Sequence, residues 1–271
     1  MTWRHLIVEQ QITLTLFQYH LVYNAISFTI AAMGAATAFF WLGRAQMAAP
    51  YKMAVTITGV VTLIALYHYF RIFESWTAAY QIDGSTAAPT DNVFNDAYRY
   101  MDWLLTVPLL LIELVMVMRL SHRETVTRGT RLAILAALMI ILGYPGEISS
   151  SDGTRWFWWV AAMIPFAWIV IELFVGLGKS IKRQPDNVRG LVNGARWLTV
   201  VMWCVYPIVF LLPMLGFQGG TWLVTEQLAY SIADITAKAV FGVLIYMIAF
   251  RKSQVEREQP APGEPVVAGD D

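Results

Sequence analysis

The chain has 271 residues, of which 57% are hydrophobic and 14% are charged, and its formal net charge at pH 7 is zero. Without a basic surplus, nucleic acid is excluded as an expected partner. The single cysteine, Cys204, excludes an intrachain disulfide, and we expect no metal site because no set of thiolate ligands is available. The hydrophobic content indicates an integral membrane protein.

The first twenty residues, MTWRHLIVEQQITLTLFQYH, lack the basic start, compact apolar core and cleavage site of a signal peptide, so we expect a short amphipathic lead-in. Seven apolar runs follow, each close to or above the length of about 20 residues that a spanning helix needs. The predicted spans cover residues 17–43, 51–75, 97–118, 129–149, 155–178, 194–216 and 224–250. The sequence therefore predicts an all-α membrane protein, a seven-transmembrane-helix bundle formed by one domain over residues 1–252.

Two segments outside the spans have distinct compositions. The longest connection, WTAAYQIDGSTAAPTDNVFND at residues 76–96, contains alternating and turn-forming residues that predict a small hairpin or an ordered loop. The tail over residues 253–271 is rich in Pro, Gly and acid, which predicts disorder.

The charged residues predict the orientation of the bundle. Fourteen of the nineteen Lys and Arg residues fall in or beside the first-to-second, third-to-fourth and fifth-to-sixth connections or in the tail, whereas the opposite side is mostly acidic. By the positive-inside rule, the N-terminus lies outside and the C-terminus is cytoplasmic. The first, third, fifth and seventh spans then run from the outside to the cytoplasm.

The third span, RYMDWLLTVPLLLIE, carries Arg99, Asp102, Thr106 and Glu113 in an otherwise apolar helix. At about 100° per residue, the two acids and the threonine share one helix face. Glu113 lies about 16 Å further toward the cytoplasm than Asp102, and Arg99 lies about one turn further out. A structural polar network is the alternative, but it explains one buried pair more easily than four groups arranged by depth.

The seventh span contains Asp234 and Lys238, an acid and an amine four residues apart on one helix face. Each such group costs roughly 2.5–3.5 kcal/mol at the centre of a membrane helix. An ion pair between the two side chains offsets this cost and is the simplest explanation for their presence. Ionisable residues inside a membrane are, however, functional by default. A desolvated lysine condenses with an aldehyde to a Schiff base, and its protonated form needs a carboxylate counter-ion.

Together, the third-span motif, DITAK in the seventh span and WCVYP in the sixth resemble the microbial rhodopsins. YHYFRIF in the second span and GYPGEIS after the fourth are similar to the same group. The triplet Asp102, Thr106 and Glu113 resembles that of the bacterial proton pumps of the proteorhodopsin and xanthorhodopsin type. The resemblance covers all seven spans and implies a light-driven ion transporter, not an enzyme, in the bacterial cell (inner) membrane. It also implies all-trans retinal joined to Lys238, which isomerises to 13-cis in light.

Residue by residue, the resemblance makes Asp102 the proton acceptor and main counter-ion, Asp234 the second counter-ion and Glu113 the proton donor on the cytoplasmic side. The apolar neighbours of Glu113 favour the protonated form of its carboxyl group in the dark. His68 matches the histidine that the group pairs with the acceptor, although without the family a lone histidine among aromatic residues is equally a packed core residue. The positions that the resemblance places along the retinal are Trp103, Trp203, Tyr206 and Pro207.

Two further positions bear on the chromophore. Carotenoid-binding xanthorhodopsins have a glycine beside the retinal ring where this chain has Trp159, and an indole fills that opening, which argues against an antenna carotenoid of that type. Leu110, four residues beyond Thr106, matches the position that sets colour, and an apolar side chain there resembles the green-absorbing members. The family also implies contact with membrane lipid and a homo-oligomer, either a trimer or a pentamer.

Other functions are weighed against the pump. A sodium pump is expected to have Asn in place of Asp102 and Gln in place of Glu113, and a chloride pump lacks the first carboxylate, so neither fits. A light sensor keeps the chromophore and signals to a partner, but the Glu113 carboxyl serves reprotonation and favours a pump. A seven-helix receptor without chromophore leaves the ordered acids unexplained. The sequence does not identify the group that releases the proton outside, although Glu147 and Glu226 lie on that side.

Overall fold

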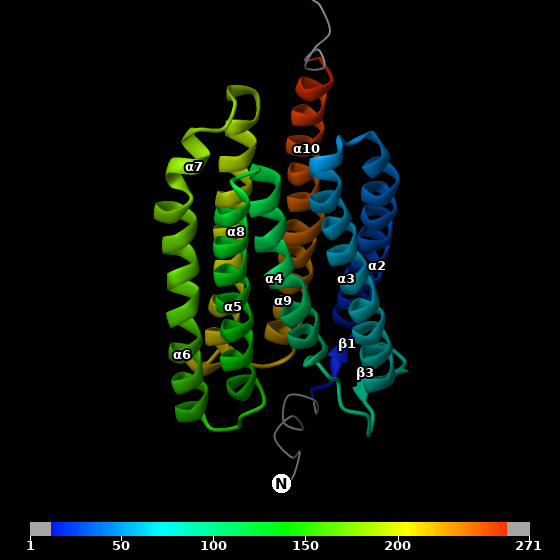
Figure 1. Ribbon diagram of the computed structural model, residues 1–271. Coiled ribbons are helices and arrows are strands. Elements are labelled where there is room, and N and C mark those ends of the chain that lie inside the picture. The colour runs from blue at the N-terminus through cyan, green and yellow to red at the C-terminus, as the bar shows by residue number, and fades with distance from the viewer. Residues whose placement is uncertain (1–11, 259–271) are drawn as a thin grey trace, which may run out of the picture.

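In a computed structural model of the protein, residues 12–258 are described and form a bundle of helices with a small sheet at one end (Figure 1). Seven helical stretches within this range are long and apolar enough to cross a membrane, which confirms the predicted fold class. They cover Leu16–Gln46, Ala49–Ala79, Tyr98–Met118, His122–Glu147, Asp152–Lys182, Asp186–Leu215 and Gly220–Glu258.

Several spans are built from more than one helical element. The first four contain α2 (Leu16–Gly43), α3 (Lys52–Ala79), α4 (Tyr98–Met118) and α5 (His122–Glu147). The fifth joins α6 (Asp152–Ile171) to α7 (Gly178–Lys182) through the π-turn η3 (Glu172–Gly176), and the sixth is α8 (Asp186–Leu211) followed by η4 (Leu212–Leu215). The seventh joins α9 (Gly220–Asp234) to α10 (Phe241–Glu258) through a second π-turn, η5 (Ile235–Val240).

Several helices extend beyond the apolar runs that predicted them, and the largest extensions are those of α5, α8 and α10. α5 begins at His122 rather than at 129, because the Ser121 hydroxyl accepts a hydrogen bond of 3.3 Å from the backbone N–H of Glu124 and caps the helix. α8 begins at Asp186 rather than at 194, directly after Pro185. α10 continues to Glu258, so the prediction of disorder is wrong for residues 253–258. Most of the predicted lead-in, and the tail from residue 259, lie outside the described residues.

The connection between α3 and α4 forms the predicted hairpin. β2 (Tyr80–Asp83) pairs antiparallel with β3 (Thr86–Pro89), with Asp83 opposite Thr86. Gly84 in the turn has a φ of 59°, a left-handed conformation that glycine adopts without strain. β1 (Leu14–Thr15) pairs with the other edge of β3, so the sheet ties the start of α2 to the connection before α4.

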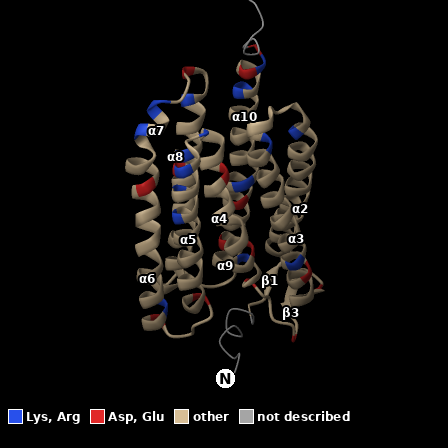
Figure 2. Cartoon of the chain, in the orientation of Figure 1, with Lys and Arg blue, Asp and Glu red and all other residues tan. Residues whose placement is uncertain are grey.

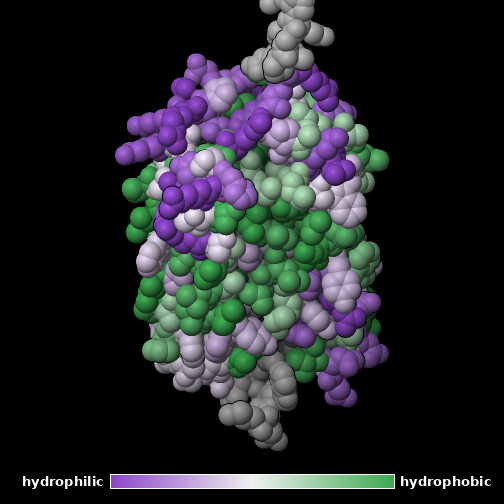
Figure 3. Space-filling model, viewed as in Figure 1, coloured by the Kyte–Doolittle hydropathy of each residue, from purple (hydrophilic) through white to green (hydrophobic). Residues whose placement is uncertain are grey.

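The outer surface is apolar around the middle of the bundle, as the face in Figure 3 shows. Large side chains such as Phe28, Leu42 and Ile164 are 67%, 78% and 66% exposed. Apolar surface on this scale is a liability in water, but it matches the hydrocarbon core of a bilayer. The helices therefore present to lipid the face that a soluble protein would bury.

Cationic side chains gather at one end of the bundle, near α7 and the end of α10 (Figure 2). We call this the cation-rich end and define it by Lys179, Lys182, Arg183, Arg251, Lys252 and Arg257. The opposite end carries β1, β2 and β3 and is called the sheet end. The positive-inside rule predicts that the cation-rich end faces the cytoplasm, and this orientation stays a prediction.

The third span is placed to carry the interior polar groups. α4 packs between α3 and α5 and also contacts α8 and α10. Its Arg99, Asp102, Thr106 and Glu113 are all 1% exposed or less. Four polar side chains of one helix are therefore enclosed by the rest of the bundle, as the helical spacing predicts.

Candidate functional site

The centre of the bundle holds a lysine between two carboxylates. Nζ of Lys238 lies 2.7 Å from Oδ2 of Asp102 on α4 and 2.7 Å from Oδ1 of Asp234 on its own span. The three side chains are at most 2% exposed. Lys238 lies in the π-turn η5, a rare element that is frequent at functional sites. The predicted ion pair with Asp234 is present, but the contact with a second acid makes it more than an internally neutral pair.

The two carboxylates differ in their hydrogen bonds. Asp234 accepts from the hydroxyls of Tyr206 (2.7 Å) and Tyr69 (2.8 Å) and from Nε1 of Trp103 (3.3 Å). Asp102 binds Lys238 through Oδ2, but its buried Oδ1 has no hydrogen-bond partner among the described residues. A buried oxygen without a partner costs free energy, which protonation reduces. Asp102 is thus better arranged than Asp234 to take up a proton.

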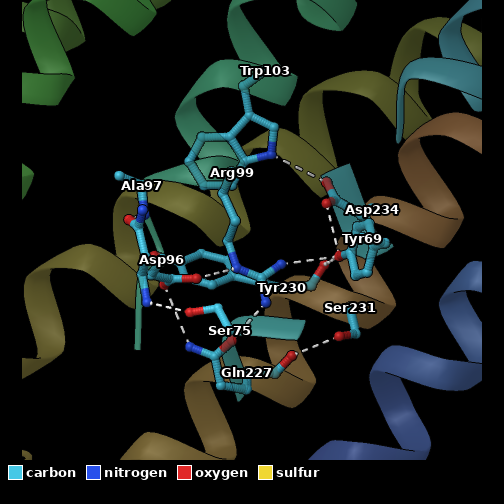
Figure 4. Close-up of polar contacts among 11 residues, drawn as sticks. Tyr69, Ser75, Asp96, Ala97, Arg99, Trp103, Gln227, Tyr230, Ser231 and Asp234 are labelled. Atoms are coloured by element: carbon cyan, nitrogen blue, oxygen red, sulfur yellow. Dashed lines mark hydrogen bonds and ion pairs between the residues drawn. The ribbon is translucent and has the colours of Figure 1, made fainter. Parts of the chain in front are cut away.

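Arg99 lies on the sheet-end side of this triad. Its NH1 donates a hydrogen bond of 3.0 Å to the Tyr69 hydroxyl, which donates in turn to Asp234 (Figure 4). Thr106, one turn from Asp102 in the other direction, donates to the backbone carbonyl of Asp102 at 2.8 Å. The predicted polar column of α4 is therefore connected to the acids, through Tyr69 in the first case and through the backbone in the second.

His68 is buried on α3, the helix that packs against α4, which carries Asp102. Its Nδ1 lies 3.0 Å from the carbonyl oxygen of Ile64, which favours a hydrogen on Nδ1 and leaves Nε2 as an acceptor. In the described part of the chain, no hydrogen bond joins the imidazole to Asp102. The role of His68 as partner of the acceptor therefore stays a prediction.

An apolar cavity extends from Lys238 between α4, α5, α6 and α8. Six residues singled out from the sequence line it, namely Trp103, Leu110, Trp159, Trp203, Tyr206 and Pro207. Further walls come from Tyr100, Met139, Phe166, Phe210 and Tyr230. Such a cavity, aromatic along its sides and closed by an amine with two carboxylates, fits a long apolar group that is attached by one end and carries a positive charge there.

Trp159 forms part of the wall that faces α8. Its Nε1 donates a hydrogen bond of 3.1 Å to the carbonyl oxygen of Pro207, which fixes the indole across the two helices. The indole is thus a fixed part of the cavity wall.

Glu113 is buried on α4 toward the cation-rich end. Its Oε2 lies 2.7 Å from the hydroxyl of Thr58 on α3, and that hydroxyl is also 3.0 Å from the carbonyl oxygen of Ala54. A hydroxyl has one hydrogen, so it cannot donate to both. When Glu113 is ionised, Thr58 donates to it; when Glu113 is protonated, the carboxyl donates to Thr58, which donates to Ala54. The contact therefore suits a carboxyl that loses and regains a proton.

Sequence reasoning missed several members of this site. Thr58, Tyr69 and Gln227 were not identified, although they contact Glu113, Asp234 and Arg99 respectively. A threonine in a membrane helix usually bonds to its own backbone, and a tyrosine among aromatic residues usually packs in the core. Only the position of Tyr69 directly after His68 offered a signal.

These features define a class of protein, a seven-helix membrane protein whose last helix holds a buried lysine against two carboxylates at the end of an aromatic cavity. The family model of the bacteriorhodopsin-like proteins matches residues 22–252. The chain therefore belongs to this family, the microbial (type I) rhodopsins, as the sequence motifs predicted.

Individual relatives support this assignment. The chain is 29% identical to green-light absorbing proteorhodopsin of Gamma-proteobacterium EBAC31A08 over 85% of this chain and 88% of that protein. The structure of xanthorhodopsin, described as a light-driven ion pump with dual chromophore, matches with a TM-score of 0.88 and 48% identity over 90% of this chain and 98% of that one. A thermophilic rhodopsin structure matches over the same shares with a TM-score of 0.88 and 40% identity.

At the level of the family, these relatives indicate a retinal-binding, light-driven proton pump, which is an ion transporter and not a classical enzyme. The seven spans and the proteorhodopsin relatives also identify an integral bacterial membrane protein, as predicted. The finer assignment of residues to steps of transport depends on the geometry of the site.

Proposed function

We propose that the protein is a light-driven outward proton pump that binds retinal covalently at Lys238, with Asp102 as the proton acceptor and Glu113 as the proton donor. The observation that carries the proposal is the inequality of the two acids beside Lys238. Both lie 2.7 Å from Nζ, but Asp234 is held by three further donors and Asp102 has a buried oxygen without a partner among residues 12–258.

The cavity supports retinal as the group bound at Lys238. Joined to Nζ as a protonated Schiff base, retinal supplies light absorption and an isomerisation that makes the Nζ proton easier to lose. The free amine of Lys238 marks the position of that nitrogen, and the two carboxylates stabilise its positive charge. Trp103, Trp203 and Tyr206 line the cavity that would hold the polyene, and their rings would exclude water from it.

Proton transfer then follows the order of the acids. The Nζ proton moves to Asp102, while Asp234 stays as the carboxylate that its donors stabilise. Glu113 replaces the lost proton from the other side, and Thr58 stabilises the carboxylate left behind. With the cation-rich end in the cytoplasm, the proton lost at Asp102 moves outward and the replacement comes from inside.

A light sensor is the second candidate, because it would share the chromophore site. Glu113 favours the pump, since a buried carboxyl with a switching hydrogen-bond partner serves fast reprotonation and has no evident part in signalling. A sensor would transmit its signal to a partner protein, which a pump does not need.

Two accessory features are part of the proposal. The fixed indole of Trp159 supports the absence of an antenna carotenoid of the xanthorhodopsin type, because it occupies the wall where such a group would approach the retinal ring. The exposed apolar surface is compatible with contact to lipid and with a trimer or pentamer. The oligomeric state stays a prediction.

The experiment that tests the attachment site is a titration of purified apoprotein with all-trans retinal. A visible absorption band is expected for the parent and for Lys252→Met, which removes a different buried lysine on the same span. Lys238→Ala is expected to stay colourless at every retinal concentration. A normal visible band in Lys238→Ala would overturn the assignment.

A further inference from the structure

A second polar cluster lies between the triad and the sheet end (Figure 4). Arg99 is 1% exposed although it carries a guanidinium group. Toward the triad, it donates to the Tyr69 hydroxyl, which donates to Asp234. In the other direction, its Nε donates a charge-assisted hydrogen bond of 2.6 Å to Oδ1 of Asp96. Arg99 thus bridges an inner carboxylate and an outer one.

Asp96 is the point at which this buried chain of hydrogen bonds reaches the surface. Its side chain is 20% exposed, whereas that of its partner Arg99 is 1% exposed. Gln227 bridges the pair, because its Oε1 accepts from NH2 of Arg99 at 2.6 Å and its Nε2 donates to Oδ2 of Asp96 at 3.4 Å. The backbone N–H of Arg99 donates to the Asp96 carbonyl at 3.0 Å, so the carboxylate has a defined position just before α4.

We propose that Asp96 is the carboxylate that receives the outgoing proton and passes it to water outside, a role that rests on the proposed pump function. Hydrogen bonds of 2.6–3.0 Å connect it to the triad through Arg99 and Tyr69. Its partial exposure gives it access to solvent. Its ion pair with Arg99 places a carboxylate, a group that can accept a proton, at the outer end of these hydrogen bonds.

The positive charge of Arg99 acts on both the triad and Asp96. Arg99 keeps its own proton throughout, because a guanidinium does not deprotonate in proteins. In the release step, the O–H bond of protonated Asp102 breaks as a water molecule beside the triad takes the proton. That water passes the proton to Asp96, where an O–H bond forms and then breaks as outside water takes the proton.

The test compares release kinetics in Asp96→Asn, Asp96→Glu and Asp91→Asn after a single flash. Asp91 is an exposed acid in the same connection and serves as the matched control. The infrared C=O band of protonated Asp102 reports when that acid loses its proton, and a pH-indicating dye reports when a proton reaches the medium. We expect Asp96→Asn to delay the dye signal at least tenfold after the loss of the Asp102 band. The other two variants are expected to match the parent.

Release without delay in Asp96→Asn would overturn the proposal, as would a delay found instead in Glu226→Gln. If Asp96→Asn does not fold, the parent provides the same test. A transient carboxylic-acid band must rise in the parent as that of Asp102 decays, and its absence would reject the role of Asp96. A parent that pumps normally while Asp96→Asn is unaffected rejects only this inference, whereas a parent that moves no proton rejects the proposed function.

Discussion

The contact between Thr58 and Glu113 gives a quantitative test of the donor. Thr58→Val keeps the shape of the side chain but removes the hydroxyl that lies 2.7 Å from Oε2. Oε1 of Glu113 is already buried without a partner within the described residues, so neither oxygen has a hydrogen bond in this variant. The Glu113 carboxylate, which forms when the donor gives up its proton, is then left unsolvated.

The size of the effect follows from the strength of such bonds. A hydrogen bond to a charged group contributes about 1.5–3 kcal/mol. Because about 1.36 kcal/mol corresponds to a factor of ten, the equilibrium for proton loss from Glu113 should fall by about ten- to a hundredfold. We expect the state with a deprotonated Lys238 nitrogen to decay about tenfold more slowly, since part of the charge has developed at the barrier.

Flash photolysis measures this decay directly. Thr58→Ser keeps the hydroxyl and is the matched control, and its decay should stay close to that of the parent. Added azide, a small diffusible acid, should restore the rate in Thr58→Val without accelerating the control to the same degree. Equal decay rates in Thr58→Val and Thr58→Ser would refute the assignment of this hydrogen bond to the donor step.

Three further variants test the other proton-transfer groups. Asp102→Asn removes negative charge beside the Lys238 nitrogen, so a red-shifted absorption spectrum and loss of pumping are expected; an unchanged spectrum would contradict its role as counter-ion. His68→Ala should move the pH of the acid colour transition if the imidazole acts on Asp102. If absorbance titrates as in the parent, His68 serves only to pack the core. Glu113→Gln should leave colour and the first transfer nearly intact but slow the decay measured by flash photolysis, with rescue by azide; unaffected decay would favour the sensor.

The sequence predicted the bundle well because its signals are local. A run of apolar residues long enough to cross a bilayer identifies a span by itself, and helical spacing alone places Asp102, Thr106 and Glu113 on one face. The distance of four residues likewise places Asp234 beside Lys238. The π-turn that holds this lysine has no comparable pattern in the sequence, and it was not predicted.

The rest of the site depends on which helices pack against each other, and a single sequence does not show which helices are neighbours. Thr58 matters because α3 places it against Glu113 on α4, and Gln227 matters because α9 brings it to Arg99. Asp96 sits in a polar loop, where an acid is usually just solvated. The ends of α5 and α10 were misjudged for another reason, since these helices continue past the apolar run into polar sequence.

The most direct test of the pump is the external pH of illuminated cells that produce the protein with retinal. The proposed function predicts reversible acidification of an unbuffered suspension in light, abolished by a protonophore and absent in Lys238→Ala and in Asp102→Asn. Two results would contradict outward proton transport. One is alkalinisation of the medium in light when no protonophore is present, and the other is a constant external pH from cells whose protein carries its full visible band.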